Sequence, residues 1–182
     1  ITTSDVSAGK YRGGHGNDNF VAGDADADFL YGGTNNGHDS FTNDSEGTSR
    51  IVADSDNTSI GLASGFDNGV DVITGNGHDG VVVTGTGGSD TFDFLETELI
   101  GVERVEGGNY HDTMVASGLT SGSYQGGHGN DTFDFDVDAA DQDHNLLDFS
   151  QGEDEIQLSN FGDALDEFDD LDLIWQKVRN KM

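Results

Sequence analysis

Glycine and aspartate recur in this sequence at a fixed spacing. The stretch GGHGNDNFV (13–21) returns almost unchanged as GGHGNDTFD (126–134). Glycine lets the backbone adopt positive φ, so that neighbouring carbonyl oxygens can point inward together. The aspartate at the sixth place adds an anionic oxygen. Carbonyl and carboxylate oxygens are the ligands that a hard cation such as Ca²⁺ prefers, at about 2.3–2.6 Å. The spacing therefore predicts cation binding.

Further copies follow the form G-G-x-G-x-D-x-U-x, in which U is a large apolar residue. The good copies are GGTNNGHDSF (32–41, with one additional residue), TGNGHDGVV (74–82), GTGGSDTFD (85–93) and GGNYHDTMV (107–115). The weaker copies are AGDADADFL (22–30) and FDNGVDVIT (66–74). Ala27 stands at the aspartate place of one weak copy, between Asp26 and Asp28, and Tyr110 replaces a fourth-place glycine. Because segment 42–65 matches poorly, the number of ions stays open.

Each copy predicts a turn followed by a short strand whose apolar residue points inward. The interval from Gly13 to Gly32 equals the interval from Gly107 to Gly126. Two nonapeptides and one inserted residue fit this interval, which predicts coils of two turns and two strands. Stacked coils would hold calcium between neighbouring turns. The half-coil ASGLTSGSYQ (116–125) has no carboxylate, so we expect the row of ions to be lopsided or broken. The core should contain Phe20, Phe41, Phe92 and Phe133.

The composition supports a fold that depends on cations. Of 182 residues, 36 are acidic and 7 basic, which gives a formal net charge of −29, and only 32% are hydrophobic. Such a chain buries too little apolar surface to offset its ordering entropy unless its charge is neutralised. About six Ca²⁺ would leave a net charge of about −17. Binding free energy would then be folding free energy.

The same composition argues against several partners. Nucleic acid and anionic membrane surfaces need clustered Lys and Arg, which this chain lacks. No apolar run approaches the length of a membrane span, so we expect no membrane insertion. Cysteine is absent, so neither disulfides nor thiolate sites contribute. The chain begins at Ile1 without a signal peptide, and we interpret it as a piece of a longer polypeptide.

Other chemistries have less support. Five histidines occupy variable turn places (His15, His38, His78, His111 and His128), where exposed turn residues are the simplest interpretation and a Zn²⁺ or Ni²⁺ site is the alternative. Carboxylates are abundant enough for a glycosidase pair to arise by chance. The H-E-x-x-H, G-x-S-x-G and phosphate-loop patterns are all absent from the sequence. We therefore expect no catalytic residues.

The repeats resemble the RTX, or haemolysin-type, calcium-binding repeats of bacterial proteins exported by type I secretion, and they cover roughly residues 13–134. The resemblance implies an all-β protein, a parallel β-roll in the form of a right-handed β-solenoid. It also implies disorder where calcium is scarce and folding after export, hence a secreted or cell-surface location. The sixth-place aspartates and the carbonyl groups of places one to four would bind several Ca²⁺. When these ligand positions are transferred to this sequence, together with aspartates of the weaker copies, the implied calcium ligands are Gly14, Gly16, Asp18, Asp26, Gly33, Gly37, Asp39, Asp71, Gly75, Gly77, Asp79, Gly88, Asp90, Gly108, Asp112, Gly127, Gly129 and Asp131.

Two segments lie outside the repeats. TFDFLETELIGVERVEGG (91–108) reads as strand, turn, strand and resembles the connecting segments of large RTX surface proteins. LLDFSQGEDEIQLSNFG (146–162) predicts two strands around an acidic turn, and 163–181 predicts an amphipathic helix. We divide the chain into a β-roll at 1–143 and a capping segment at 144–182, with Phe168 and Trp175 as apolar plugs. The helix could instead bind a partner.

The sequence thus predicts a non-catalytic module that folds on binding Ca²⁺ and stabilises a secreted bacterial protein. Two alternatives stay open. The first is an accessory module of an extracellular enzyme, such as an alginate epimerase or a protease, which could contact an extracellular polysaccharide through calcium. The second is a segment of a large RTX adhesin or surface-layer protein.

Overall fold

The computed structural model describes residues 9–22, 26–33, 37–43, 47–139 and 141–160. These residues form short strands joined by turns, with one 3-10 helix, η1 (Val137–Ala139). The expected helix at 163–181, with Phe168 and Trp175, lies outside the described residues. Within the part that the structure describes, no helix is long and apolar enough to cross a membrane.

The strands belong to four parallel sheets. Sheet I contains β1 (Gly9–Tyr11), β3 (Ala27–Tyr31), β5 (Ser49–Ala53), β8 (Val72–Thr74) and β11 (Glu98–Ile100). Sheet II contains β6 (Ser59–Gly61), β9 (Val82–Thr84), β12 (Arg104–Asn109), β14 (Gly122–His128) and β16 (His144–Leu146). Sheet III contains β7 (Phe66–Asp67), β10 (Thr91–Asp93), β13 (Thr113–Val115), β15 (Thr132–Asp136) and β17 (Glu155–Ser159). Sheet IV pairs β2 (Asn19–Ala22) with β4 (Ser40–Asn43).

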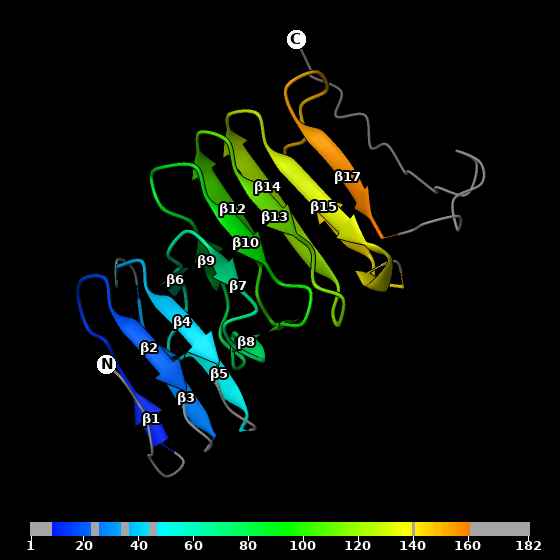
Figure 1. Ribbon diagram of the computed structural model, residues 1–182. Coiled ribbons are helices and arrows are strands. Elements are labelled where there is room, and N and C mark those ends of the chain that lie inside the picture. The colour runs from blue at the N-terminus through cyan, green and yellow to red at the C-terminus, as the bar shows by residue number, and fades with distance from the viewer. Residues whose placement is uncertain (1–8, 23–25, 34–36, 44–46, 140, 161–182) are drawn as a thin grey trace.

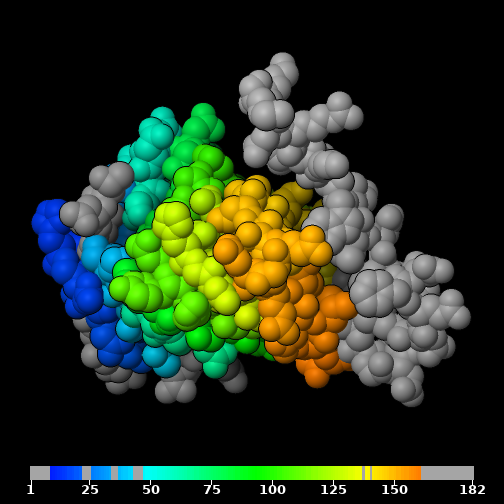
Figure 2. All heavy atoms as spheres, turned by 90° about the horizontal axis from the view of Figure 1, so that it is seen from above, coloured from blue at the N-terminus to red at the C-terminus, as the bar shows by residue number. Residues whose placement is uncertain are grey.

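The sheets wind into a β-solenoid of about six turns. Neighbouring strands in every sheet come from successive coils and run parallel. Figure 1 shows the strands following one another from β1 at one end to β17 at the other. In the space-filling view of Figure 2, the colours likewise cross the molecule in chain order. The prediction of an all-β parallel β-roll is confirmed.

The coils do not all have the same number of sides. The chain alternates between sheets I and IV up to β4, visits sheets I, II and III in turn from β5 to β13, and then alternates between sheets II and III. Val105 pairs with Tyr124 of the next coil. The two residues are as far apart in the sequence as Gly107 and Gly126, as the prediction of two-strand coils requires. Phe66, however, pairs with Phe92, so a coil there takes up a longer piece of the chain. The two-strand prediction is therefore wrong for the middle of the chain, because the apolar stretches 51–53, 72–74 and 98–100 form a third side.

The expected core phenylalanines are buried. Phe20, Phe41, Phe92 and Phe133 are at most 8% exposed. The parallel register places like residues above one another: Phe20 pairs with Phe41, and their rings stack with centroids 5.1 Å apart. In the connecting segment 91–108, Phe94, Leu99 and Val105 are also buried, although this segment forms three strands instead of two. The core is thus one column of apolar side chains along the solenoid axis.

Sheet I ends at β11, where the carboxylate-free half-coil begins. Residues 116–121 form no strand, and the Thr120 hydroxyl accepts a hydrogen bond from the Leu99 N–H at 2.8 Å. Tyr124 is 1% exposed, and its hydroxyl accepts a hydrogen bond from the Ser117 N–H at 2.9 Å. Side-chain hydroxyl groups therefore satisfy the backbone here, where the repeat would have an aspartate.

We predict that Ile73→Ala lowers the free energy of unfolding by about 2–5 kcal/mol, since the side chain is 0% exposed and its loss leaves a cavity. Ile100→Ala is the matched control: Ile100 is 47% exposed on neighbouring β11, and its loss should cost no more than about 0.5 kcal/mol. Urea unfolding measures both. Equal effects of the two substitutions would contradict the assigned core.

Candidate metal-binding turns

Five of the predicted aspartates directly precede a strand of sheet III or sheet IV. Asp18 and Asp39 precede β2 and β4 of sheet IV, and Asp90, Asp112 and Asp131 precede β10, β13 and β15 of sheet III. Asp39, Asp90, Asp112 and Asp131 are no more than 2% exposed. The side chains therefore point into the turns and not into solvent. Such complete burial is unusual for a carboxylate without a cationic partner.

Along sheet III the aspartates form a ladder. The N–H of Asp90 donates to Asp112 Oδ1 at 2.7 Å, and the N–H of Asp112 donates to Asp131 Oδ1 at 2.9 Å. The N–H of Asp131 donates to Asp154 Oδ1 at 3.0 Å. We call Asp90, Asp112, Asp131 and Asp154 the carboxylate ladder. Asp18 and Asp39 repeat the contact at the other end of the molecule, at 2.7 Å.

In several repeats the first glycine makes room for the aspartate of the same turn. A Cβ atom on Gly107 would collide with Asp112 Oδ2, and one on Gly126 would collide with Asp131 Oδ2. Gly127 and Gly129, at places two and four, have φ of 99° and 145°, which side chains rarely allow. Glycine at places one, two and four thus lets this turn close around its own carboxylate without strain.

Carbonyl oxygens lie between consecutive turns. Gly108 O lies where a Cβ atom on Gly127 of the next coil would be. In the same way, Tyr110 O lies against Gly129, and Gly16 O lies against Gly37. Among the described residues, no three or more His, Asp or Glu side chains are arranged to hold a metal ion by themselves. An ion bound here would therefore need these carbonyl oxygens in addition to the aspartates. Such an all-oxygen donor set suits Ca²⁺.

The charge of the ladder has no protein counter-ion in the described chain. The ion pairs of Lys10, Arg12, Arg50 and Arg104 all involve other carboxylates. Asp112 Oδ2 and Asp18 Oδ2 are buried without a hydrogen-bond partner. Burial raises the pKa of Asp112 to about 6, with Asp131 and Asp90 adding to the shift, and burial also raises the pKa of Asp131. The residues present therefore fit a bound cation, which would supply the missing positive charge.

The turn carboxylates differ in whether hydrogen bonds from the protein satisfy both of their oxygens. Where Thr86 stands at place two, its N–H donates to Asp90 Oδ2 at 2.6 Å and its hydroxyl to Asp90 Oδ1 at 2.8 Å. Asp39 Oδ2 accepts the hydroxyl of buried Tyr31. The turns with glycine at place two, before Asp18 and Asp112, leave one oxygen without a partner. These two turns fit an ion best.

Three predicted ligands lie away from these rows. Asp79 is exposed in the turn between β8 and β9, which also contains Gly75 and Gly77. Asp26 is also exposed and accepts the Thr48 N–H at 2.9 Å. Asp71, before β8, accepts the N–H of Ser49 at 2.7 Å and its hydroxyl at 2.9 Å.

The remaining predicted glycines lie in or beside the turns, as expected. Gly14 and Gly16 belong to the turn before β2, Gly33 and Gly37 to the turn before β4, and all four have positive φ. Gly88 lies in the turn before β10, and Gly108 lies near the end of β12, where the chain enters the turn before β13.

Two carboxylates of the last coil were missed. Asp154 belongs to FSQGEDEIQ (149–157), a further copy that keeps Gly152, Asp154 and Ile156 but has Phe and Ser at the first two places. The Ser150 N–H donates to Asp154 Oδ2 at 2.7 Å. Asp148 accepts the N–H groups of Gly126 and Gly127 at 2.9 and 2.8 Å. Matching on places four, six and eight alone would have found Asp154; nothing in the repeat marks Asp148.

The histidines face the turns from outside. His15, His111 and His128 are exposed, and His38 and His78 are partly exposed. His111 Nδ1 accepts the Asn130 N–H at 2.9 Å, and His78 Nδ1 lies 3.1 Å from Asp56 Oδ1. Their contacts are those of turn residues.

Comparison with known proteins identifies no relative: neither a protein-family model, nor a curated protein, nor a solved structure matches the chain.

In metal-free buffer with enough of an excluded osmolyte such as TMAO to keep these turns folded, we predict that the difference in the free energy of unfolding between the wild type and Asp112→Asn changes with pH. The folded-state pKa of Asp112, about 6, lies above its unfolded value of 3.8, so the folded chain binds the proton first. The wild type should gain stability relative to the variant as pH falls from 7 to 4. Urea unfolding at each pH measures this. A difference that stays constant between pH 7 and pH 4 would contradict the assignment of Asp112 as a buried carboxylate with a raised pKa.

The turn at Tyr110 allows a second test. Tyr110 has φ of 75° and a side chain that is 61% exposed, so it bears backbone strain with little packing. Tyr110→Gly should raise the free energy of unfolding by about 0.5–1 kcal/mol, because relief of the strain exceeds the entropy cost of glycine. Gly129→Ala in the neighbouring turn should lower it. A loss of stability in Tyr110→Gly, measured by urea unfolding, would contradict this account.

Proposed function

We propose that this chain is a calcium-binding module, and that Ca²⁺ bound between neighbouring turns stabilises its fold. The observation that carries the proposal is Asp112: its side chain is 1% exposed, one carboxylate oxygen has no partner, and no described cationic side chain pairs with it. Leaving such a charge uncompensated costs several kcal/mol on the scale of buried ions. A cation removes that cost only in the folded state, where the turns are stacked.

The choice of Ca²⁺ over other ions follows from the donors. Aspartate and carbonyl oxygens suit Ca²⁺ and Mg²⁺, but Mg²⁺ demands near-octahedral geometry and keeps several waters. The stacked turns offer carbonyl groups from two coils, which favours the ion that tolerates irregular coordination by oxygen. The turns 107–112 and 126–131 would hold it through Asp112, Asp131 and neighbouring carbonyl groups.

The resemblance to RTX repeats and the solenoid fold support a more specific proposal. The module belongs to a larger secreted or cell-surface bacterial protein and folds when it meets extracellular calcium. Its role there is structural, without catalysis of its own. The strong negative charge of the coils that carry the calcium sites opposes their folding until calcium is bound.

The proposal is tested by far-UV circular dichroism during a calcium titration in buffer freed of metal. We expect β signal and thermal stability to increase at about 0.1–1 mM Ca²⁺, the range of extracellular modules, and not with Mg²⁺ at the same concentration. A spectrum and an unfolding temperature that calcium leaves unchanged would overturn the proposal.

Two matched substitutions locate the site. Asp112→Asn should lower the calcium affinity of the tightest site by about tenfold or more, as measured by titration calorimetry, because it removes the anionic ligand. Asp79→Asn removes the same charge from an exposed turn and should leave that affinity within about twofold. If both variants bind like the wild type, the site is not at the ladder.

A further inference from the structure

Residues 47–105, which we call the central segment, differ from the coils on either side in how their turns are satisfied. Four buried side-chain atoms of the described chain have no hydrogen-bond partner, on Asp18, Asp112, Asp134 and His144. All four lie outside the central segment. The central turns therefore close without leaving a buried polar group that needs an ion.

Hydroxyl groups take the place of carboxylates in these turns. The hydroxyl of Thr58 donates to Ser55 O at 2.6 Å, and that of Thr97 donates to Val70 O at 2.8 Å. Thr58, Thr97 and Ser49 are at most 1% exposed. A neutral hydroxyl group satisfies a backbone carbonyl without adding charge, so these turns carry no electrostatic demand for a cation.

The carboxylate ladder is also interrupted here. Phe66 pairs with Phe92, which places Ser64 level with Asp90 in the adjacent coil. The Ser64 hydroxyl donates to Ser89 O and accepts the Thr91 N–H, both at 3.3 Å. Asp90, the ladder member inside the segment, is satisfied by Thr86 of its own turn. The central segment thus separates the Asp18–Asp39 contact from the carboxylate ladder.

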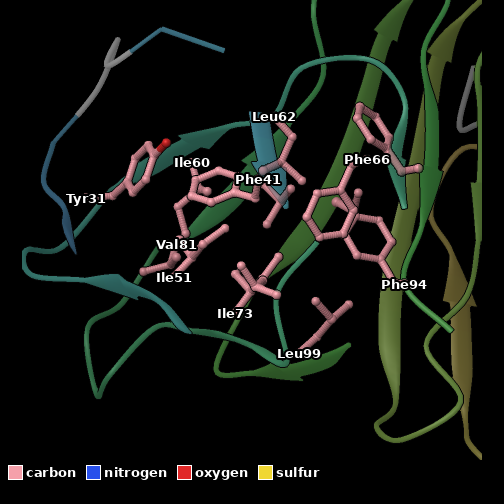
Figure 3. Close-up of a cluster of buried hydrophobic side chains, with 14 of the residues drawn as sticks. Tyr31, Phe41, Ile51, Ile60, Leu62, Phe66, Ile73, Val81, Phe94 and Leu99 are labelled. Atoms are coloured by element: carbon pink, nitrogen blue, oxygen red, sulfur yellow. The ribbon is translucent and has the colours of Figure 1, made fainter. Parts of the chain in front are cut away.

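The apolar core is concentrated in the same segment. It supplies fourteen of the 24 buried hydrophobic residues, whereas residues 106–160 supply five. Figure 3 shows Ile51, Ile60, Leu62, Ile73 and Val81 converging from different sides of the coil. The central segment has ten acidic and two basic residues, whereas 106–160 has twelve acidic residues and no basic one. Apolar burial and charge both favour independent folding of the centre.

We propose that the central segment is a calcium-independent folding core, on which the outer coils assemble when cations bind. The proposal rests on the calcium function proposed above for the outer turns. In a solenoid each coil contacts only its neighbours, so a folded centre offers two parallel edges on which the next strands can pair. The edge strands of this centre are β5 on one side, on which β3 pairs, and β10 and β12 on the other, on which β13 and β14 pair. Calcium would thus extend an existing structure and would not have to nucleate one.

Hydrogen–deuterium exchange of the full chain, followed by mass spectrometry of its peptides, tests this. In metal-free buffer, we expect peptides from 49–105 to be protected and those from 9–22 and 106–139 to exchange at the rate of an unfolded chain. Added Ca²⁺ should then protect the outer peptides by more than tenfold. This pattern supports a calcium-independent core.

Two other patterns overturn it, and they separate the two proposals. If all peptides exchange freely without metal and all become protected with Ca²⁺, the calcium function stands but the core does not exist. If all peptides are protected without metal, both the division into core and outer coils and the calcium requirement fail.

A matched pair of substitutions makes the test specific. Ile73→Ala and Phe133→Ala both remove a side chain that is at most 1% exposed, one in the central segment and one outside it. Without metal, Ile73→Ala should lower protection of 49–105 by more than tenfold, and Phe133→Ala should leave it unchanged. Loss of central protection in Phe133→Ala without metal would show that the centre depends on the outer coils and would overturn the proposal.

Discussion

The rest of the structure depends on carboxylates buried inside stacked turns. Parallel pairing brings successive strands to about 4.7–4.9 Å, so an aspartate that ends each turn meets the aspartate of the next coil. The backbone N–H of one then donates to the carboxylate of the other, from Asp90 through Asp112 to Asp131. This arrangement orders the turns but brings like charges together in a region from which water is largely excluded. Every solenoid built in this way must find positive charge or use fewer aspartates.

The residue at the second place of the repeat affects how the carboxylate is satisfied. The Thr86 hydroxyl donates to the aspartate of its own turn, whereas Gly108 has no side chain to do so. Asp112 is left with an oxygen that has no partner. Contacts from outside the turn also matter, since Asp39, with Gly33 at the second place, accepts the hydroxyl of Tyr31. The pattern of glycine and aspartate alone does not distinguish a turn that is complete in itself from one that fits an ion.

Much of the fold could be predicted from the repeat, because each copy encodes its own turn, strand and inward residue. Phe20, Phe41, Phe92 and Phe133 occupy the core for this reason. The third side of the central coils could not be predicted, because β5 and β11 contain no glycine–aspartate pattern and their pairing depends on contacts between coils. Asp154 was missed because the first half of its repeat has diverged, and the exposure of Asp79 follows from a turn between different sheets.

The change from two sides to three has a consequence for how such a chain can lengthen. At the ends, a pair of nonapeptides adds one complete coil, since the interval between Val105 and Tyr124 returns the chain to the same face. In the centre, an insertion of that length would be too short to traverse three sheets, because the coil from Phe66 to Phe92 takes up more of the chain. Duplication of the repeat is therefore compatible with growth at the outer coils alone. The three-sided central coils would then stay the same, and solenoids of different length could arise by adding two-sided coils at either end.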